Sequence, residues 1–219
     1  MKSEAFIAGR HLYLRGLESK DINPRYVRWL NDPEVNIFMA TRRFPTTLED
    51  LQGFYEKIKA DPNALYFAVC LKKDGTHIGN VKLDKIDWIS RVAEFGLLIG
   101  EKKQWGHGRG SEAAYLISKH GFFQLNLKRI TIFLTEENAG ALKCYERAGY
   151  QREGILREAV FLNGQYRNVV AMGQLKGEFQ SRAQYEPKYR LYHRRGRGQS
   201  QWKSGGGQKN GGRGLRLRL

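Results

Sequence analysis

One short stretch decides the fold of this chain, and it reads Trp105-Gly106-His107-Gly108-Arg109-Gly110. An apolar, strand-like run precedes it at 95–99, and residues 111–117 have the apolar spacing of a helix. Glycines let a backbone approach a ligand closely, and the first N–H groups of a helix have no partner within the helix. The helix dipole adds partial positive charge at the same point. The stretch therefore predicts a site for a phosphate or pyrophosphate.

The spacing of the glycines narrows the kind of phosphate site. A dinucleotide fingerprint would read Gly-x-Gly-x-x-Gly, and a nucleoside-triphosphate loop would end in Gly-Lys-Ser/Thr. The stretch reads Gly-x-Gly-x-Gly and matches neither pattern. Taken alone it is a weak signal that is also compatible with a flexible loop before a helix, so a second motif has to decide between the two interpretations.

That second motif lies downstream, where a strand-like run at 129–135 precedes the segment 138–150. Asn138 is suited to cap a helix, and Gly149 is suited to end it in a left-handed turn. Four apolar residues of the segment share one helical face, namely Ala141, Leu142, Tyr145 and Ala148. With both motifs in this order and spacing, the chain resembles the GNAT family of acyl-CoA N-acyltransferases over roughly residues 7–176.

The resemblance implies that acetyl-CoA is the cosubstrate, with its pyrophosphate held by residues 105–110. It further implies that backbone N–H groups near Leu98 and Ile99 face the thioester carbonyl and the pantetheine amides. Two roles stay open: Asn138 either contacts acetyl-CoA or only caps its helix, and His107 either touches phosphate or is an exposed loop histidine. Within the family, the chain looks most like the branch that holds ribosomal-protein N-terminal, spermidine and amino-sugar acetyltransferases.

The resemblance implies that the acceptor amine attacks the thioester directly. This reaction needs a base for the amine proton and an acid for the departing thiolate. Tyr145 matches the family's tyrosine, and a phenol with a pKa of about 10 can protonate a departing thiolate. The alternative is that Tyr145 only packs. Some family members carry a glutamate where Phe133 stands here. Glu94 is therefore the next candidate for the base, with a solvated carboxylate at a strand end as the alternative.

The apolar patterns along the chain predict an α+β fold with one mixed, largely antiparallel central sheet flanked by helices. Asp74-Gly75 and Asn163-Gly164 mark two hairpin turns, and Thr47 is suited to cap a helix with Asp50 three residues later. The resemblance places the acceptor pocket among helices at roughly 21–60, the part that varies most within the family.

The charge of the chain divides it into two parts. Its 219 residues carry a net charge of +16. Residues 182–219 hold eleven Lys and Arg against one acidic residue, together with many glycines, whereas residues 1–181 hold 27 basic and 21 acidic residues. We predict an acetyltransferase domain at 1–181 and a disordered basic tail at 182–219. Weak RNA or ribosome contact and a dispensable extension are both compatible with such a tail.

Other features exclude several classes of protein. Cys70 and Cys144 are the only cysteines and lie far apart, so we expect neither a disulfide scaffold nor a metal site. The start of the chain resembles no secretory signal, and no apolar run approaches the roughly 18 residues of a membrane span. We therefore expect a cytoplasmic enzyme with no metal and no membrane partner.

Proton energetics rank the possible acceptor amines. An α-amine with a pKa near 8 is about one tenth neutral at pH 7, whereas a lysine-type amine near 10.4 is almost fully protonated. Without a glutamate at position 133, the chain suits an amine of low pKa, and its net positive body does not attract a polycation. We therefore rank the expected acceptors as a protein or peptide N-terminus first, an amino sugar second and a polyamine third. Two non-enzymatic alternatives are a CoA-binding sensor and an RNA- or ribosome-associated protein.

Overall fold

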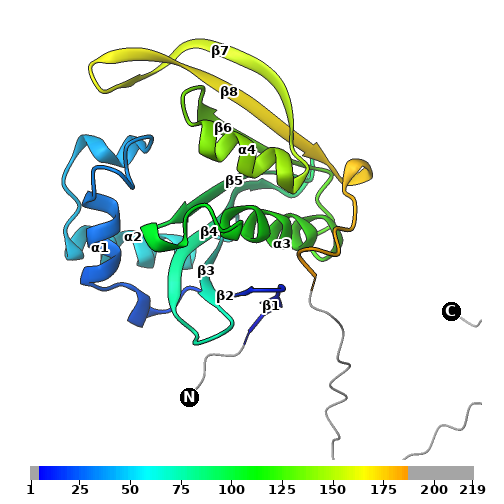
Figure 1. Cartoon of the computed structure of the whole chain (residues 1–219), viewed down its shortest axis with the longest axis horizontal. Helices are drawn as coiled ribbons and strands as arrows, with labels where there is room; N and C mark the ends of the chain where they lie inside the picture. Colours follow the sequence, from blue (N-terminus) through cyan, green and yellow to red (C-terminus); the bar gives the residue numbers. More distant parts are fainter. Residues whose placement is uncertain (1–4, 187–219) are drawn as a thin grey trace, which may run out of the picture. The chain divides into compact units, whose positions relative to one another are not determined.

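One sheet of eight strands forms the centre of the computed structural model, which describes residues 5–186 (Figure 1). The strand order is β1-β2-β3-β4-β5-β6-β8-β7, and every pairing is antiparallel except that of β5 with β6. The strands are β1 (Ile7–Ala8), β2 (Leu12–Gly16), β3 (Leu65–Leu71), β4 (His77–Asp87), β5 (Val92–Ile99), β6 (Arg129–Thr135), β7 (Gln151–Leu162) and β8 (Gln165–Leu175). This mixed, largely antiparallel sheet confirms the predicted fold class.

Four α-helices flank the sheet in the described part of the chain. They are α1 (Pro24–Asn31), α2 (Leu48–Ala60), α3 (Arg109–Phe123) and α4 (Ala139–Ala148), and short 3-10 turns include η1 (Ser19–Asp21) and η2 (Ala40–Arg43). The main core lies between the sheet and the pair α3 and α4, whereas a smaller cluster of Tyr26, Trp29, Leu30 and Leu51 joins α1 and α2. Leu98 of β5 packs against that smaller cluster, so β5 separates two packed layers.

The parallel pairing of β5 with β6 is short, and this shapes the centre of the sheet. The two strands pair only from Val92 to Glu94 on β5, while β4 stays paired with β5 as far as Ile99. From Phe95 to Ile99, therefore, one edge of β5 has no partner strand among the described residues. Its N–H and C=O groups need other partners there, which a ligand can provide.

The long β7–β8 hairpin reaches past the rest of the sheet toward the segment around η2 (Figure 1). Its turn is the predicted one, with Asn163 and Gly164 both at positive φ, as a two-residue hairpin turn requires. At the tip, Arg42 Nη1 donates a hydrogen bond of 2.6 Å to Asn163 Oδ1. The hairpin thus touches the chain between α1 and α2.

The packed body extends a few residues past the boundary predicted at 181/182. Tyr185 is 8% exposed, and its ring lies 5.1 Å from that of Tyr115 on α3. Glu186 accepts hydrogen bonds from the Tyr115 hydroxyl at 2.8 Å and from Lys119 Nζ at 2.7 Å. Residues 182–186 therefore belong to the domain, because two aromatic rings and a carboxylate hold them against α3. The rest of the predicted tail lies outside the described residues.

Candidate active site

The glycine loop leads into α3 as predicted, and two of its glycines have a conformational reason. Gly106 and Gly108 have φ values of 74° and 72°, in the left-handed region that glycine adopts without strain. Gly108 is the N-cap of α3, and a Cβ at either glycine would meet open space. The first intrahelical bond runs from Glu112 N to Gly108 O, so the N–H groups of the three residues between them have no acceptor in the helix.

Gly110 serves packing instead. A Cβ at this position would lie 2.9 Å from Cys144 Sγ on α4 and 3.4 Å from Leu97 Cδ2 on β5. Only glycine lets α3 begin so close to both elements. The first turn of α3 is thereby held next to the unpaired edge of β5, which brings two parts of the predicted acetyl-CoA site together.

Trp105 and His107 close the loop on themselves and on β5. The Trp105 indole donates a hydrogen bond of 2.7 Å to the Ile99 carbonyl oxygen, and His107 Nδ1 lies 2.7 Å from the Trp105 carbonyl oxygen. Both side chains are exposed, while Arg109 is half-buried and its Nε has no partner among the described residues. Trp105 thus anchors the loop through its side chain and leaves the backbone of the loop available.

The second motif places Tyr145 against β5 from the α4 side. Asn138 Oδ1 accepts a hydrogen bond of 3.1 Å from Ala141 N, so its capping role is present. Tyr145 is 7% exposed, and its ring lies edge-on to Phe95 at 5.4 Å. Burial raises the pKa of Tyr145 far above its ordinary value, which keeps the phenol protonated at neutral pH.

Glu94 lies on the opposite face of β5 from Phe95, because side chains alternate along a strand. Its carboxylate forms a 2.8 Å ion pair with Lys85, and in the sheet it stands directly opposite Asp84 of β4. The Tyr145 ring and the Glu94 side chain therefore lie on opposite faces of β5. An acid and a base on either side of a thioester would be arranged in this way.

A cavity of about 470 Å³ lies on the Glu94 face of β5, between the sheet and the α1–α2 layer. Its floor includes Gly96, Leu97 and Leu98 of β5, and α1, α2 and the segment between them contribute much of the rest. Aromatic rings and a few polar groups distinguish the lining, namely Tyr26, Phe54, Tyr66, Thr46, Asp50, Asn80 and Lys82. The expectation of an acceptor pocket within 21–60 accounts for α1 and α2, but it omitted Tyr66, Asn80 and Lys82.

The omitted residues come from β3 and β4, whose sequences are dominated by core positions. Val81 and Leu83 of β4 pack into the main core, while Asn80 and Lys82, which alternate with them along the strand, line the cavity. The period-two alternation holds the only sequence signal for this, and that signal gains meaning once the neighbouring layer is known.

A buried polar chain lies behind the cavity. Arg15 holds both oxygens of Asp21, at 2.6 and 2.7 Å, and His77 Nε2 lies 2.9 Å from Asn80 Oδ1. Burial would raise the pKa of Asp21, but the hydrogen bonds from Arg15 and from the Glu18 N–H lower it. Burial lowers the pKa of His77, although Asp21 opposes this. The chain fixes Asn80 at the wall of the cavity.

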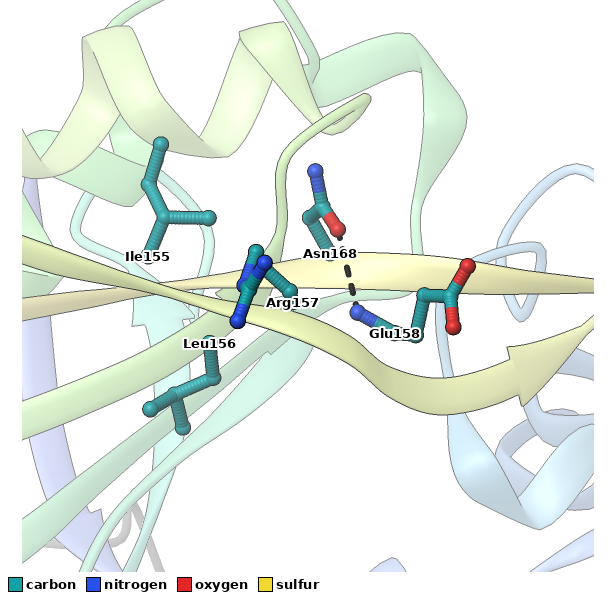
Figure 2. A pocket seen from close by; sticks show the side chains of 5 residues that line it. All are labelled: Ile155, Leu156, Arg157, Glu158 and Asn168. Carbon is teal, nitrogen blue, oxygen red and sulfur yellow. Dashed lines mark hydrogen bonds between the residues drawn. The ribbon is translucent and has the colours of Figure 1, made fainter.

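A second, more open hollow of about 730 Å³ lies on the β7–β8 hairpin, where two register shifts leave β7 with extra residues (Figure 2). Figure 2 shows Ile155 and Leu156 on opposite sides of the strand, and the Glu158 N–H donates a 3.0 Å hydrogen bond to Asn168 Oδ1. None of the predicted site residues lines this hollow. Of those residues, Leu98 lines the cavity beside β5 and Glu94 does not, and this cavity is the candidate acceptor site.

Residues 5–186 lack two features that would point to other kinds of site. They contain no cluster of three or more His, Cys, Asp or Glu side chains placed to hold a metal ion. They also contain no helix that is both long and apolar enough to cross a membrane.

Comparison with known proteins gives the family. The acetyltransferase (GNAT) domain family matches residues 11–151. Spermidine N(1)-acetyltransferase of Escherichia coli K12 is 35% identical over 160 residues, which cover 73% of this chain and 83% of that protein. The chain belongs to the GNAT acetyltransferase family. It is an N-acetyltransferase that uses acetyl-CoA as its cosubstrate, as the two motifs predicted.

The solved structures agree with this assignment. The crystal structure of spermidine N-acetyltransferase from Vibrio cholerae with CoA and spermine superposes with a TM-score of 0.70 at 29% identity. The superposed region covers 77% of this chain and 97% of the Vibrio cholerae chain. A Bacillus subtilis relative that is provisionally named a ribosomal N-acetyltransferase is 26% identical over 180 residues, or 78% of this chain and 94% of that protein. The family is thus shown, while the predicted ribosomal branch gains no specific support.

Proposed function

We propose that this chain acetylates a primary amine that binds in the cavity beside β5. One observation carries the proposal: the free edge of β5 from Phe95 to Ile99 has the glycine loop near its end and the cavity on one face. Acetyl-CoA lying along that edge would bring its thioester to the floor of the cavity. The acceptor would then reach the carbonyl carbon from the α1–α2 side.

The proposed reaction is a single displacement. The amine nitrogen attacks the acetyl carbonyl carbon, the C–N bond forms and the C–S bond breaks. The amine loses a proton to Glu94, directly or through water, and the CoA sulfur takes a proton from Tyr145. Backbone N–H groups at Leu98 and Ile99 would hold the thioester and pantetheine. Those of the loop from Gly106 to Gly110 would hold the pyrophosphate, with Asn138 beside the CoA.

For the acceptor, we propose a protein or peptide N-terminus first and an amino sugar next. The support is the proton energetics of an α-amine and the presence of Phe133 on β6, at the position where some family members carry a glutamate. A polyamine is the rival candidate, and similarity to two spermidine acetyltransferases favours it. Contact of the basic tail with RNA or ribosomes has no support among these relatives, and most of that tail lies outside the described residues.

Comparing kcat/KM on three acceptors tests the assignment. They are a peptide that starts with serine, an amino-sugar nucleotide and spermidine, each assayed by thiol release from acetyl-CoA. We expect kcat/KM for the peptide to exceed that for spermidine by about tenfold or more, because a larger fraction of an α-amine is neutral at pH 7. A tenfold advantage for spermidine would assign the chain to the polyamine enzymes. No thiol release with any amine, despite CoA binding, would instead favour a sensor.

A further inference from the structure

Lys82 carries a positive charge into the acceptor cavity, in the middle of a row of three residues that crosses the sheet. It stands opposite Tyr66 of β3 on one side and Gly96 of β5 on the other. Its side chain lies over Gly96, since a Cβ there would fall 2.5 Å from Lys82 Cε. Gly96 belongs to the floor of the cavity, so the ammonium group of Lys82 lies next to the proposed reaction centre.

The partners of this ammonium are those that proteins use to bind amine ligands. Lys82 Nζ forms an ion pair with Asp84 and lies 5.7 Å from the centre of the Tyr66 ring. A carboxylate beside an aromatic face is a favourable site for an ammonium ion. The side chain of Lys82 is 35% exposed, whereas that of Asp84 is 16% exposed. The cation site of the cavity is therefore filled by the chain's own lysine.

Other charges around the cavity do not restore an attraction for cations. Asp50 is the one acidic residue of the lining, and its carboxylate accepts hydrogen bonds from Thr47 N and Thr47 Oγ1. The segment between the lining residues Met39 and Thr46 also carries Arg42 and Arg43, whose side chains donate hydrogen bonds to the β7–β8 hairpin, to Asn163 Oδ1 and the Phe161 carbonyl oxygen. The lining thus holds one cation, Lys82, and one anion, Asp50, which is already engaged by Thr47.

We propose that Lys82 sets the charge of the acceptor, so that the cavity takes an amine whose body carries a carboxylate or phosphate and disfavours a polycation. This rests on the proposed function, because it concerns the same acceptor site. A second ammonium of a polyamine would meet Lys82 at close range, and like charges side by side weaken binding strongly. An anionic group would instead share Lys82 with Asp84.

The test is the full-length Lys82→Met variant, which removes the charge and keeps much of the stem. Three acceptors are compared: a Ser-Glu peptide for a carboxylate, an amino-sugar nucleotide for a phosphate, and spermidine. We expect kcat/KM to rise about tenfold or more for spermidine and to fall about tenfold for whichever anionic acceptor the wild type uses. Lys82→Arg should keep the wild-type order. Lys73→Met is the matched control, since Lys73 is 71% exposed in the β3–β4 turn.

Two results would overturn the proposal. One is a ratio of spermidine to anionic acceptor that changes by less than about threefold in Lys82→Met while CoA affinity and melting temperature stay normal. The other is an equal change in Lys73→Met, which would make the effect one of net charge. Failure of the proposed function looks different, because wild type would then release no thiol with any amine. Calorimetric titration with spermidine would still report whether Lys82→Met gains affinity.

Discussion

The two sides of β5 are built in different ways. On the side of the glycine loop, one continuous stretch from Trp105 to Gly110 and the nearby α4 supply the predicted acetyl-CoA site, mostly through backbone geometry. On the other side, the cavity draws its lining from α1, α2, β3, β4 and β5, with side chains between Tyr26 and Leu98. Backbone recognition suits a cosubstrate that never changes, and scattered side chains suit an acceptor that varies between relatives.

The largest effect should come from a charge placed in the glycine loop. We expect Gly108→Glu to abolish measurable CoA binding, because it puts a carboxylate beside the expected pyrophosphate and forces a side chain into a φ of 72°. Calorimetry with CoA is the measurement. Gly108→Asn separates strain from charge, since asparagine tolerates this conformation, and it should lose far less affinity.

Gly177→Glu is the control for that experiment, because Gly177 has open space around it and lies outside the loop. A folded Gly108→Glu protein with wild-type CoA affinity would contradict the contrast drawn between the two sides of β5. It would show that the cosubstrate does not depend on the backbone of this loop.

The next largest effect should come from Tyr145, the proposed proton donor on the α4 side of β5. Tyr145→Phe should lower kcat by about 10²- to 10⁴-fold, the range for a positioned proton donor, and leave CoA affinity unchanged. Tyr150→Phe is a matched control: Tyr150 is also buried, but its hydroxyl bonds Ser118 at 2.7 Å. It should cost about 1 kcal/mol of stability with little change in kcat. Equal turnover in the two variants would make Tyr145 a packing residue.

The same contrast explains what the sequence could predict. Glycines at positive φ, a helix cap at Asn138 and the Asn163-Gly164 turn are local, so their residue types predict them. The sheet followed from apolar runs and the family resemblance. Lys82 and Tyr66 escaped prediction because their shared row depends on the register of three strands. Tyr185 escaped because it precedes a basic, glycine-rich stretch and was counted with it, and only its packing against Tyr115 reveals its place.

A third prediction concerns the support of α3 from the C-terminal segment. Ending the chain after Ser181 removes Tyr185 and Glu186, and we expect a loss of about 2–4 kcal/mol from one buried aromatic side chain and its stacking. The melting temperature should fall by roughly 5–10 °C. Ending the chain after Lys188 is the control and should change it little. An unchanged melting temperature after both truncations would mean that Tyr185 adds nothing to the support of α3.

The smallest expected effect is a pH dependence on the acceptor side. His77 is 5% exposed, with Asp21, Arg15 and Arg25 as its charged neighbours, and burial lowers its pKa below the ordinary 6.5. At and below pH 6.5, therefore, the unfolded chain binds a proton at His77, whereas the folded chain leaves His77 neutral until a lower pH. Stability is fully present above that pH and falls as the pH drops toward the folded pKa, by up to about 1.4 kcal/mol per pH unit.

Urea unfolding at pH 7.5, 6.5 and 5.5 measures this slope, and His77→Gln should flatten it while keeping a donor and an acceptor in place. His107→Gln is the control, because His107 lies exposed in the glycine loop. His120 is also partly shielded and its pKa is lowered by burial, so some slope should remain in His77→Gln. A slope equal to that of the wild type would show that His77 is not held neutral. The wall of the cavity at Asn80 would then be set by a charged imidazole that Asp21 stabilises, and the acceptor side would carry one more positive charge.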